Sequence, residues 1–393
     1  MEQFKTQKFT FFALITVIFL LESLNLYYTF NIKFDIKTMN RLVIIGNGFD
    51  LAHGLKTSYA DFLEWYINDF INRLENESST IYDKDPLCTV RSRDDYHSVR
   101  EYLPIGSCST IEDLEKRTYL RVSRSNLLSN IMHNYKEKGW VDIEEIYYTM
   151  LKKYIFNDYS IQTKVSKVKE LNAQLDFLKR KLIEYLSNIE VKDNRESINQ
   201  IIHSAVDIEH EVVNSMSEAI KVQHGGRNKC TPSQIMMLTF NYTSLAELYC
   251  KYCEKCHYIH GRLMDTESVI FGYGDELDDD YKNIAKCNEN EYLKHFKSYK
   301  YLERSVYKDV LRFIESDKFQ IMILGHSCGN SDRTLLNTLF NHKNCISIKP
   351  YYYINDKGED NYSDLIMNIS RSFNDTADMR SKVVDKEHCN ELK

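Results

Sequence analysis

The fold is decided by the stretch Arg41-Leu42-Val43-Ile44-Ile45-Gly46-Asn47-Gly48-Phe49-Asp50. Residues 42–45 form a short apolar run after Arg41, which predicts a strand buried inside a parallel sheet, and the glycines form the turn that ends it. Ser58 and Asp61 then have the spacing of a capping box ahead of an amphipathic helix. A strand, a glycine turn and a helix in this order are typical of α/β proteins.

Strand-like runs return much later in the chain. We expect strands at 234–240, 258–259, 269–271, 319–324 and 346–348, and helices at 244–254 and 332–341. Because these strands alternate with helices, the chain is predicted to be an α/β protein with a parallel, Rossmann-like sheet. Residues 39–72 and 231–350 are predicted to form this core.

A large, mostly helical insertion is predicted over residues 73–230. Apolar residues repeat there at intervals of three and four, which predicts one long amphipathic helix that includes Val165, Val168, Leu171, Leu175, Leu178, Leu182, Leu186 and Ile189. Packing of this helix onto the core is favoured over a coiled coil, because the repeat spans few turns. Residues 351–393 are predicted to hold a C-terminal helix and a polar tail that is frayed after Phe373.

Composition limits the class of protein. The chain has 393 residues, a net charge of −6 and a pI of about 6.1. Domains that bind nucleic acid usually carry a basic excess, so no specific nucleic-acid partner is expected, although a local basic patch would escape this test. The 10 cysteines lack the regular spacing of a small disulfide scaffold, and we expect reduced thiols in a cytoplasmic protein.

Residues 1–38 precede the folded pattern. Their apolar run, 9–21, is shorter than the roughly 20 residues that a bilayer-spanning helix needs, and no small-residue cleavage site follows it. Met39 stands directly before the first predicted strand. We interpret residues 1–38 as an upstream extension or a weak hydrophobic anchor, so a membrane location is expected only if this segment is translated and retained.

Compact polar groups follow the predicted strands. These groups are Gly46-Asn47-Gly48 with Asp50, Thr239-Phe240-Asn241-Tyr242, His260-Gly261-Arg262, Gly272-Tyr273-Gly274-Asp275, and Gly325-His326-Ser327 with Ser331-Asp332. Ligands of open parallel sheets bind outside the carboxyl ends of the strands. Each residue taken singly is more often an ordinary turn or half-buried residue. Taken together they predict one cleft, lined by Asn47, Asn241, His260 and Ser327.

The glycine turn after the first strand favours a phosphate ligand. Glycines let the backbone approach a phosphate, and a helix N-terminus offers aligned N–H donors. A dinucleotide fingerprint for hydride transfer requires a third glycine where Leu51 stands, so that function is excluded. A nucleotide bound in another manner is predicted, with a turn that binds nothing as the alternative. The residues predicted to contact the nucleotide are Gly46, Asn47, Gly48, Asp50, Gly325, Ser327 and Asp332.

Two other kinds of site are disfavoured. Potential zinc ligands occur at Cys250, Cys253, Cys256 and His257. They lack a second ligand pair and have the spacing of a packed helix face, so no metal is expected. The segment Gly325-His326-Ser327-Cys328-Gly329 has the Gly-x-Ser-x-Gly pattern of a hydrolase nucleophile. The downstream His342 and His388 lie in contexts that do not suit a catalytic triad.

The chain resembles the AbiH abortive-infection family. The opening signature of that family is similar to Leu42-Val43-Ile44-Ile45-Gly46-Asn47-Gly48-Phe49-Asp50-Leu51-Ala52-His53-Gly54-Leu55, followed by Thr57-Ser58-Tyr59 and Asp61-Phe62. Shorter motifs follow in the family's order: Trp140-x-Asp142-x-Glu144, Thr239-Phe240-Asn241-Tyr242, Ile259-His260-Gly261, Phe271-Gly272 and Gly325-His326-Ser327 with Ser331-Asp332. The resemblance spans about residues 39–345 and implies a bacterial protein of defence against bacteriophage.

The layout resembles sirtuin-like domains more remotely. In those domains a glycine turn holds the phosphates of NAD, an asparagine touches the ribose and a His-Gly pair supplies the catalytic histidine. The resemblance implies a sirtuin-like sheet in which Gly46 and Gly48 hold NAD or a related nucleotide, with Asn241 and His260 as catalytic residues. Asn47 replaces the usual alanine of the turn and the zinc module is not recognisable, so deacetylation is not expected.

The chemistry implied by these resemblances is hydrolysis of NAD, which arrests the infected cell. His260 would accept a proton, Asn241 would orient the ribose or water, and Asp50 or Asp332 would stabilise positive charge on the sugar. Because a strand-end residue contributes little packing, replacing His260 is expected to remove activity with little loss of stability. The alternative is a nucleotide-gated sensor without turnover, whose insertion recognises a phage-derived trigger. A homo-oligomer is left open.

Overall fold

The computed structural model describes residues 39–393 apart from 95, 139–140, 192–194, 213–215, 224 and 252–254. The predicted N-terminal extension or anchor, residues 1–38, lies outside the described residues. Within the described part of the chain, no helix is long and apolar enough to cross a membrane.

The centre of the molecule is a sheet of five parallel strands in the order β10-β9-β1-β7-β8. Its strands are β1 (Asn40–Ile45), β7 (Ile235–Thr239), β8 (Cys256–Tyr258), β9 (Phe319–Leu324) and β10 (Cys345–Tyr351). The first strand lies in the middle, and the strand order reverses between β1 and β9. β1 is buried along its whole length, as the apolar run 42–45 predicts for its second part, and the polar Asn40 and Arg41 are buried as well. The predicted α/β class and parallel sheet are confirmed.

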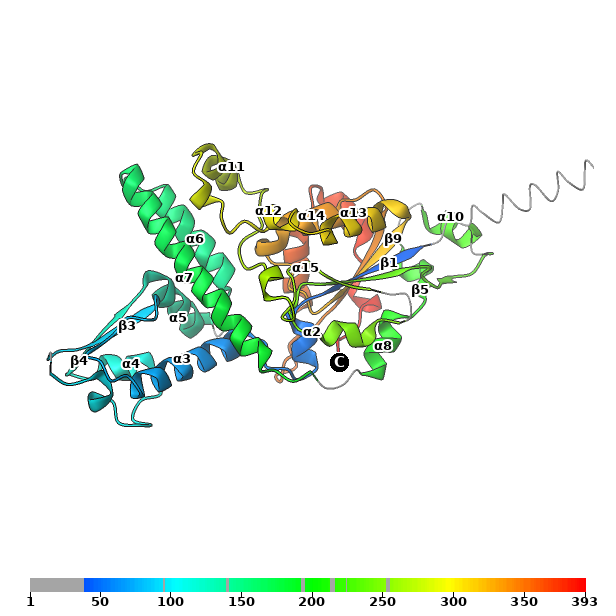
Figure 1. The fold of residues 1–393 in the computed structure, drawn as a ribbon. Helices are drawn as coiled ribbons and strands as arrows, with labels where there is room; N and C mark the ends of the chain where they lie inside the picture. The colour runs from blue at the N-terminus through cyan, green and yellow to red at the C-terminus, as the bar shows by residue number, and fades with distance from the viewer. Residues whose placement is uncertain are drawn as a thin grey trace, which may run out of the picture.

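Helices cover both faces of the sheet (Figure 1). One face packs against α13 (Val306–Ser316), α14 (Arg333–Phe340) and α15 (Tyr362–Arg371). The other packs against α2 (Asn47–Ala52), α8 (Glu196–Ile202) and the 3-10 turn η2 (Leu245–Tyr249). Side chains alternate between the faces along a strand, so Ile44 belongs to the first core and Ile45 to the second.

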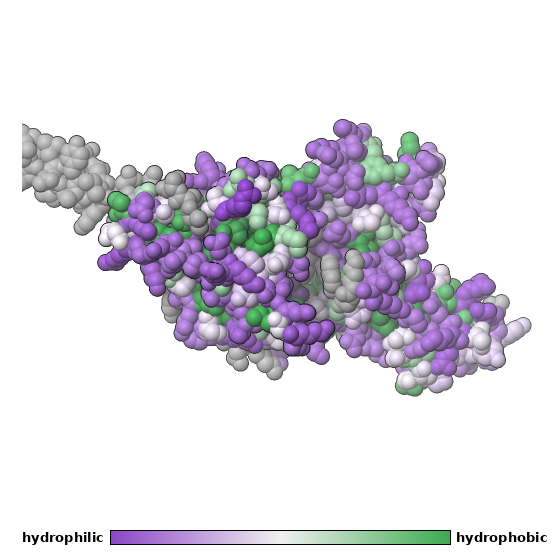
Figure 2. Space-filling model, turned by 180° about the vertical axis from the view of Figure 1, so that it is seen from behind, coloured by the Kyte–Doolittle hydropathy of each residue, from purple (hydrophilic) through white to green (hydrophobic). Residues whose placement is uncertain are grey.

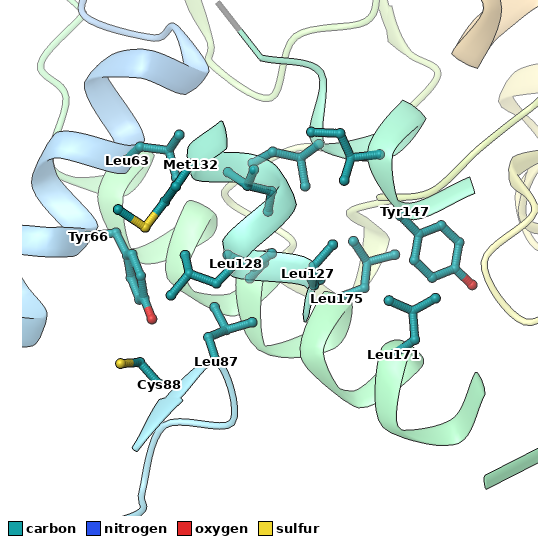
Figure 3. Packing of buried hydrophobic residues seen from close by; sticks show 14 of the residues in the cluster. Leu63, Tyr66, Leu87, Cys88, Leu127, Leu128, Met132, Tyr147, Leu171 and Leu175 are labelled. Atoms are coloured by element: carbon teal, nitrogen blue, oxygen red, sulfur yellow. The ribbon is translucent and has the colours of Figure 1, made fainter. Parts of the chain in front are cut away.

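A second lobe is formed by residues between β1 and β7 (Figure 1). Its elements are α3 (Tyr59–Glu75), α4 (Ile111–Glu115), α5 (Asn126–Lys138), α6 (Ile143–Ile155), α7 (Ile161–Ser187), the 3-10 turn η1 (Val99–Tyr102) and an antiparallel sheet of β2 (Ile81–Tyr82), β3 (Cys88–Ser92) and β4 (Leu120–Arg124). The lobe has its own hydrophobic core, in which Tyr66, Leu128 and Leu175 come from three different helices (Figure 3). The long helix is confirmed as α7, and it packs against α3 and α6.

Helix α3 belongs to the second lobe by its packing. Its capping box is present, with Ser58 Oγ accepting from the backbone N–H of Asp61 at 3.1 Å. The apolar side of this predicted amphipathic helix, which includes Phe62 and Phe70, faces the core of the lobe and not the sheet. The second lobe therefore begins with α3, whereas the sequence predicts that the insertion begins after this helix, at residue 73.

The described elements outside these groups complete both parts of the molecule. They are β5 (Val206–Asp207), α9 (Ile208–Glu211), α10 (Met216–Gln223), β6 (Lys229–Cys230), η3 (Thr266–Ser268), α11 (Asp279–Lys286), η4 (Asn290–Tyr292), α12 (Lys297–Tyr301), η5 (Asn330–Asp332), α16 (Thr376–Lys382) and η6 (Lys386–His388). Residues of β5 and α9 pack with Met39 and Ile346, next to the amino ends of β1 and β10.

Two predicted elements are wrong. Residues 269–271 form no strand; Ile270 and Phe271 are apolar because they are buried in the cores of the sheet and of the second lobe, respectively. The helix predicted at 244–254 is only the short turn η2, which ends at Tyr249. Apolar character reports burial in these segments but not the type of element.

The tail after Phe373, predicted to be frayed because it is polar, instead forms α16 and runs beside β10. Isolated parallel bridges join it to Ile348 and Tyr352. Leu392 is buried against the second face of the sheet. A few spaced apolar residues are enough to fix a polar segment when each of them reaches a core.

Candidate functional site

A cleft of about 820 Å³ lies at the carboxyl edge of the parallel sheet. Its walls come from the segments that follow the five strands and from the second lobe, which contributes Val141, Asp142, Glu144, Leu182 and Leu186. All the residues predicted to form the site line it: Gly46, Asn47, Gly48, Asp50, Asn241, His260, Gly325, Ser327 and Asp332. The predicted meeting of these residues at one edge is confirmed, and what they bind stays a prediction.

The polar group 272–275 is not among the residues that line the cleft. The N–H of Gly272 donates to Glu144 Oε1 at 2.9 Å. Gly274 packs close to Lys297, since a Cβ at this glycine would lie 3.4 Å from that side chain. This segment therefore contacts two residues of the site, Glu144 and Lys297, without lining the cleft itself.

The two glycine turns pack against each other where the strand order reverses. The N–H of Gly48 donates to the carbonyl of Gly325 at 2.8 Å. A Cβ added at Gly46 would lie 2.5 Å from His326 Cα, and one at Gly325, whose φ is +68°, would lie 2.1 Å from Phe49 N. Glycine is therefore required for the packing of the two turns, whether or not a phosphate binds.

The N-terminus of α2 offers fewer donors than the sequence predicts. The N–H of Gly48 is bonded to the β9 turn, and that of Phe49 donates to Gly46 O at 2.9 Å. Asn47 is exposed, and its Oδ1 accepts from Thr57 Oγ1 at 2.6 Å. A phosphate at this end of the cleft would depend on side chains more than on the six-residue helix.

Asp50 and Asn241 join the first turn to the end of β7. The Asp50 carboxylate is buried and accepts from Asn241 Nδ2 at 2.7 Å and from Thr243 Oγ1 at 2.6 Å. Asn241 Nδ2 also donates to Gly46 O at 3.0 Å. Burial raises the pKa of Asp50 to about 6, although the two hydrogen bonds act in the opposite direction. The amide nitrogen of Asn241 is thus used within the protein, and a ligand would meet its carbonyl oxygen.

Asp332 belongs to a buried network of charged side chains. Its Oδ1 lies 2.9 Å from Lys297 Nζ and 3.1 Å from His260 Nε2, and its Oδ2 lies 3.5 Å from His326 Nε2. Lys297 Nζ is also 2.9 Å from Glu144 Oε2, and Lys297 is 0% exposed. The network therefore links the ends of β8 and β9 to α6 of the second lobe.

The contacts decide the charges in this network. Burial alone would raise the pKa of Asp332, but Lys297 and His260 hold it well below its ordinary value. Burial would lower the pKa of Lys297, but Asp332 and Glu144 raise it above its ordinary value. Burial raises the pKa of Glu144 to about 7 and outweighs Lys297. Asp332 and Lys297 therefore form an ion pair, whereas Glu144 takes up a proton near neutral pH.

Both histidines are placed to donate to Asp332. His326 Nδ1 accepts the N–H of Cys328 at 3.0 Å, so the proton of its neutral ring lies on Nε2, towards Asp332. His260 Nε2 lies 3.2 Å from the hydroxyl of Tyr301 as well as close to Asp332. Burial and Lys297 lower the pKa of His260, although Asp332 acts against them, so this ring is neutral at pH 7.

His260 is a packed residue. It is 4% exposed, and its ring lies edge-on to Phe240 with centroids 5.1 Å apart. The expectation that replacing His260 leaves stability nearly unchanged therefore does not hold. A truncated side chain would leave a cavity and remove a donor from a buried carboxylate.

The surroundings of Ser327 do not support a serine hydrolase. In the described part of the chain, no hydrogen bond joins the Ser327 hydroxyl to a histidine. Positive φ values in this turn fall on Gly325, at +68°, and Cys328, at +55°, and not on Ser327. His342 pairs with Glu315 outside the cleft.

The cysteines considered for zinc are only partly described. The thiols of Cys250 and Cys256 interact with each other, and Cys253 lies outside the described residues. Among the residues that the structure describes, no group of three or more His, Cys, Asp or Glu is placed to hold a metal ion.

Several residues that complete the site receive no role in the sequence analysis. They are Glu144, Thr243, Lys297, Tyr301 and His326. Glu144 and His326 lie in short family motifs, which is a signal that would have found them. Lys297 has no comparable signal, because a lysine in a polar segment is normally a surface residue.

The fold and the cleft define a class: an α/β protein whose parallel sheet and second lobe enclose a cleft of ligand size. The family model described as "Bacteriophage abortive infection AbiH" matches residues 42–353, which is most of the chain. The protein therefore belongs to the AbiH family, and the resemblance of its opening motif is confirmed. Its family implies a role in abortive infection by bacteriophage. Neither the curated proteins nor the solved structures provide a match.

Proposed function

We propose that the cleft binds a nucleotide and that this AbiH protein hydrolyses NAD there to arrest the infected cell. The observation that carries the proposal is the Asp332–His260 pair, buried at 3.1 Å beside the point where the strand order reverses. In open, Rossmann-like sheets this point of the carboxyl edge is where nucleotides bind. The cleft volume of about 820 Å³ suits a ligand of that size.

The chemistry is cleavage of the bond between nicotinamide and ribose. Water attacks the anomeric carbon as nicotinamide leaves with the bonding electrons, and the proton of the water passes to a base. The products are ADP-ribose, nicotinamide and a proton. The sugar carries positive charge in the transition state, as in other glycoside hydrolyses.

Two residues of the buried network fit this chemistry. Asp332 keeps its negative charge and would stabilise the cationic sugar by its field. With the Nε2 proton of His260 directed at Asp332, the Nδ1 lone pair of the ring is its acceptor for a proton from water. A carboxylate that fixes the tautomer of a neutral histidine is the relation found in catalytic triads. The carbonyl oxygen of Asn241 would orient the water or the ribose.

The polar rim of the cleft would hold the rest of the nucleotide. Asn47 and Ser327 are exposed side chains on the two turns that meet at the reversal point. The remote sirtuin-like resemblance supports the same layout, with the phosphates near Gly46 and the reacting bond near His260.

A nucleotide-gated sensor is the second candidate. The observation that favours it is the contribution of the second lobe to the cleft, through Leu182 and Leu186 of α7 and through Glu144. A bound nucleotide would contact both parts of the molecule and bias their arrangement without turnover. A phage-derived trigger would then act through the second lobe.

Release of nicotinamide tests the proposal. The full chain is incubated with NAD, and free nicotinamide and ADP-ribose are quantified by chromatography. We expect release by the unaltered protein and a loss of about 100-fold or more in Asp332→Asn and in His260→Asn. His342→Asn is the matched control, because His342 also pairs with a carboxylate but lies outside the cleft.

The same samples separate the two candidate functions. Binding of NAD in calorimetry without any nicotinamide would reject hydrolysis and support the sensor. Absence of both binding and release with NAD and with other nucleotides would reject the nucleotide proposal. Equal losses in His342→Asn and His260→Asn would show that the assay reports stability and not the site.

A further inference from the structure

A second, smaller pocket lies between α7 of the second lobe and segments that follow β8. It has a volume of about 150 Å³, and none of the residues that line it also lines the cleft. Asp176 and Lys179 of α7 form one wall, and residues from the segments 267–271 and 294–304 form the others. More than half of these residues are charged, and both signs are present. The pocket therefore suits a small ligand that carries charge.

His295 presents an acceptor to this pocket. Its side chain is only 9% exposed, and its ring bonds to the carbonyl of Phe271. Burial lowers the pKa of His295 to about 4, so the ring is neutral at pH 7 and the nitrogen that does not face Phe271 carries a lone pair. Among the residues that the structure describes, none makes a hydrogen bond to that nitrogen, Nε2. A ligand with an N–H or O–H group would satisfy this buried acceptor.

Asp176 adds a second acceptor at the same place. Its Oδ1 lies 3.6 Å from His295 Nε2, which is longer than a hydrogen bond. Its Oδ2 lies 2.9 Å from Lys294 Nζ, so Oδ1 is the oxygen that remains for the pocket. Two acceptors that face each other need a donor between them. A primary ammonium fits this position, because it carries a positive charge and three N–H bonds.

Two charges of opposite sign at the pocket have no ion pair within the described part of the chain. Lys179 is half-buried, which lowers the pKa of its ammonium, and acidic groups of the pocket act on it only from a longer distance. Glu267 is exposed and likewise makes no ion pair. Other charges are already used, since Lys300 pairs with Glu303 at 2.7 Å and Arg304 pairs with an aspartate outside the pocket. Lys179 is therefore the cation that is left to bind an anionic group.

We propose that this pocket binds a free α-amino acid with a small side chain, such as glycine, alanine or serine. Its ammonium lies between Asp176 and His295, and its carboxylate pairs with Lys179, which is three residues from Asp176 on the same face of α7. Glu267 provides a second carboxylate beside the ammonium. The volume of about 150 Å³ is below the roughly 300–1,000 Å³ of pockets for drug-sized ligands, so only a small side chain fits.

Other ligands fit these groups less well. A phosphate would satisfy Lys179, but it would bring negative charge against Asp176. A metal ion needs further ligands, and no group of three or more His, Cys, Asp or Glu among the described residues is placed to hold one. A protein partner would need a broad apolar surface, whereas the described hydrophobic residues form only small groups on the side of the molecule shown in Figure 2.

The pocket borders the candidate site without being part of it. Lys297, whose ammonium is shared by Glu144 and Asp332, lies between the pocket residues His295 and Lys300 along the chain. An amino acid held by α7 and by His295 would join the second lobe to the segment that carries Lys297. Binding in this pocket is independent of the reaction proposed for the cleft.

Calorimetric titration of the full chain, without any nucleotide, tests the proposal. The probes are glycine, L-alanine and L-serine, together with L-alaninamide, which lacks the carboxylate, and N-acetyl-L-alanine, which lacks the ammonium. We expect a Kd below about 1 mM for at least one of the three amino acids. Both blocked forms should bind about tenfold more weakly, because each of them leaves one end of the pocket without its partner.

Two variants assign the two ends of the ligand. Lys179→Met should weaken binding of the amino acid about tenfold and leave that of L-alaninamide unchanged, whereas Asp176→Asn should weaken binding of both. Lys167→Met is one control, since it lies on α7 but outside the pocket. Asp309→Asn is the other, since its side chain is 34% exposed against 35% for Asp176. Melting temperatures within about 2 °C of each other confirm that all variants are folded.

Three results would overturn the proposal. The first is a Kd above about 1 mM for all three amino acids. The second is binding by Lys179→Met and Asp176→Asn that equals binding by the control variants. The third is tighter binding of inorganic phosphate than of any of the amino acids, which would make the pocket a site for simple anions.

Discussion

The two sides of the cleft hold their aspartates in opposite ways. Asp50, on the β1 side, and Asp332, on the β9 side, are both buried and both line the same space. Asp50 is bonded by the neutral side chains of Asn241 and Thr243, and its pKa is raised to about 6. Asp332 faces Lys297, and its pKa is held well below its ordinary value. Burial favours the protonated form of a carboxyl group. The two hydrogen bonds to Asp50 do not overcome this effect, whereas the ammonium of Lys297, together with His260, overcomes it at Asp332.

The two sides of the cleft also differ in the parts of the molecule that build them. Asp50 is held by the ends of two neighbouring strands, β1 and β7. Asp332 is held by Lys297, whose ammonium is shared with Glu144 of the second lobe. The charged side of the cleft therefore depends on the docking of the two parts of the molecule, whereas the neutral side does not. Each prediction below changes one side of the cleft.

The largest effect is expected for Lys297→Met. This substitution leaves Asp332 and Glu144 buried without their shared cation, and we expect a loss of about 3–5 kcal/mol in the free energy of unfolding at pH 7. Urea unfolding measures it. Lys294→Met is the control, since this side chain is 46% exposed and its ammonium pairs with Asp176, and the substitution should cost at most about 1 kcal/mol. Similar losses in both variants would contradict the importance of the buried pair.

A smaller effect, with a distinct pH dependence, is expected for Asp50→Asn. The pKa of Asp50 is about 6 in the folded state and near 3.8 when unfolded, so the folded state holds the extra proton between these values. The contribution of Asp50 to stability is fully present below about pH 4 and is lost as pH rises through 6. The total loss is about 3 kcal/mol at most.

Comparison of unfolding curves for the two proteins isolates this contribution. The stability of the unaltered chain minus that of Asp50→Asn should decrease from pH 4 to pH 7. A difference that is constant over this range, or that increases, would show that Asp50 is ionised as easily as an exposed aspartate.

Thr243→Val removes one neutral donor from the same carboxylate. A hydrogen bond to a charged group contributes about 1.5–3 kcal/mol, and one to a neutral group about half of that. We therefore expect a loss of about 2 kcal/mol at pH 7 and about 1 kcal/mol at pH 4. Thr338→Val, which removes a hydroxyl bonded to a helix carbonyl, should show no such pH dependence. A stability loss that is larger at pH 4 than at pH 7 would contradict the assignment of Asp50 as neutral at pH 4 and charged at pH 7.

The smallest effect on stability is expected for Asn47→Ala. Its bond to Thr57 is exposed, so the free energy of unfolding should change by about 0.5 kcal/mol or less. Because Asn47 stands at the rim of the cleft, nucleotide affinity measured by calorimetry should fall, with Asn188→Ala at the exposed end of α7 as control. A stability loss above about 1 kcal/mol would make Asn47 a structural residue of the turn.

Much of the fold was predictable because local signals agree with it. The run at 319–324 is β9 as predicted, and the three-and-four spacing from Val165 onwards marks α7. The meeting of Asn47, His260 and Ser327 in one cleft followed from the rule that parallel strands end at one edge. Predictions failed where neighbouring apolar residues enter two different cores, as at Ile270 and Phe271, since burial there does not imply a strand.

The amino-acid sequence by itself determined the parallel sheet, the place of the cleft and the family, because each follows from runs of adjacent residues. The tertiary structure alone decided which side of the cleft is charged. Lys297 is buried only because α6 and η5 bring Glu144 and Asp332 to it from 153 and 35 residues away along the chain. A charge in a protein interior depends on all the groups that surround it, and those groups are neighbours in space and not in sequence.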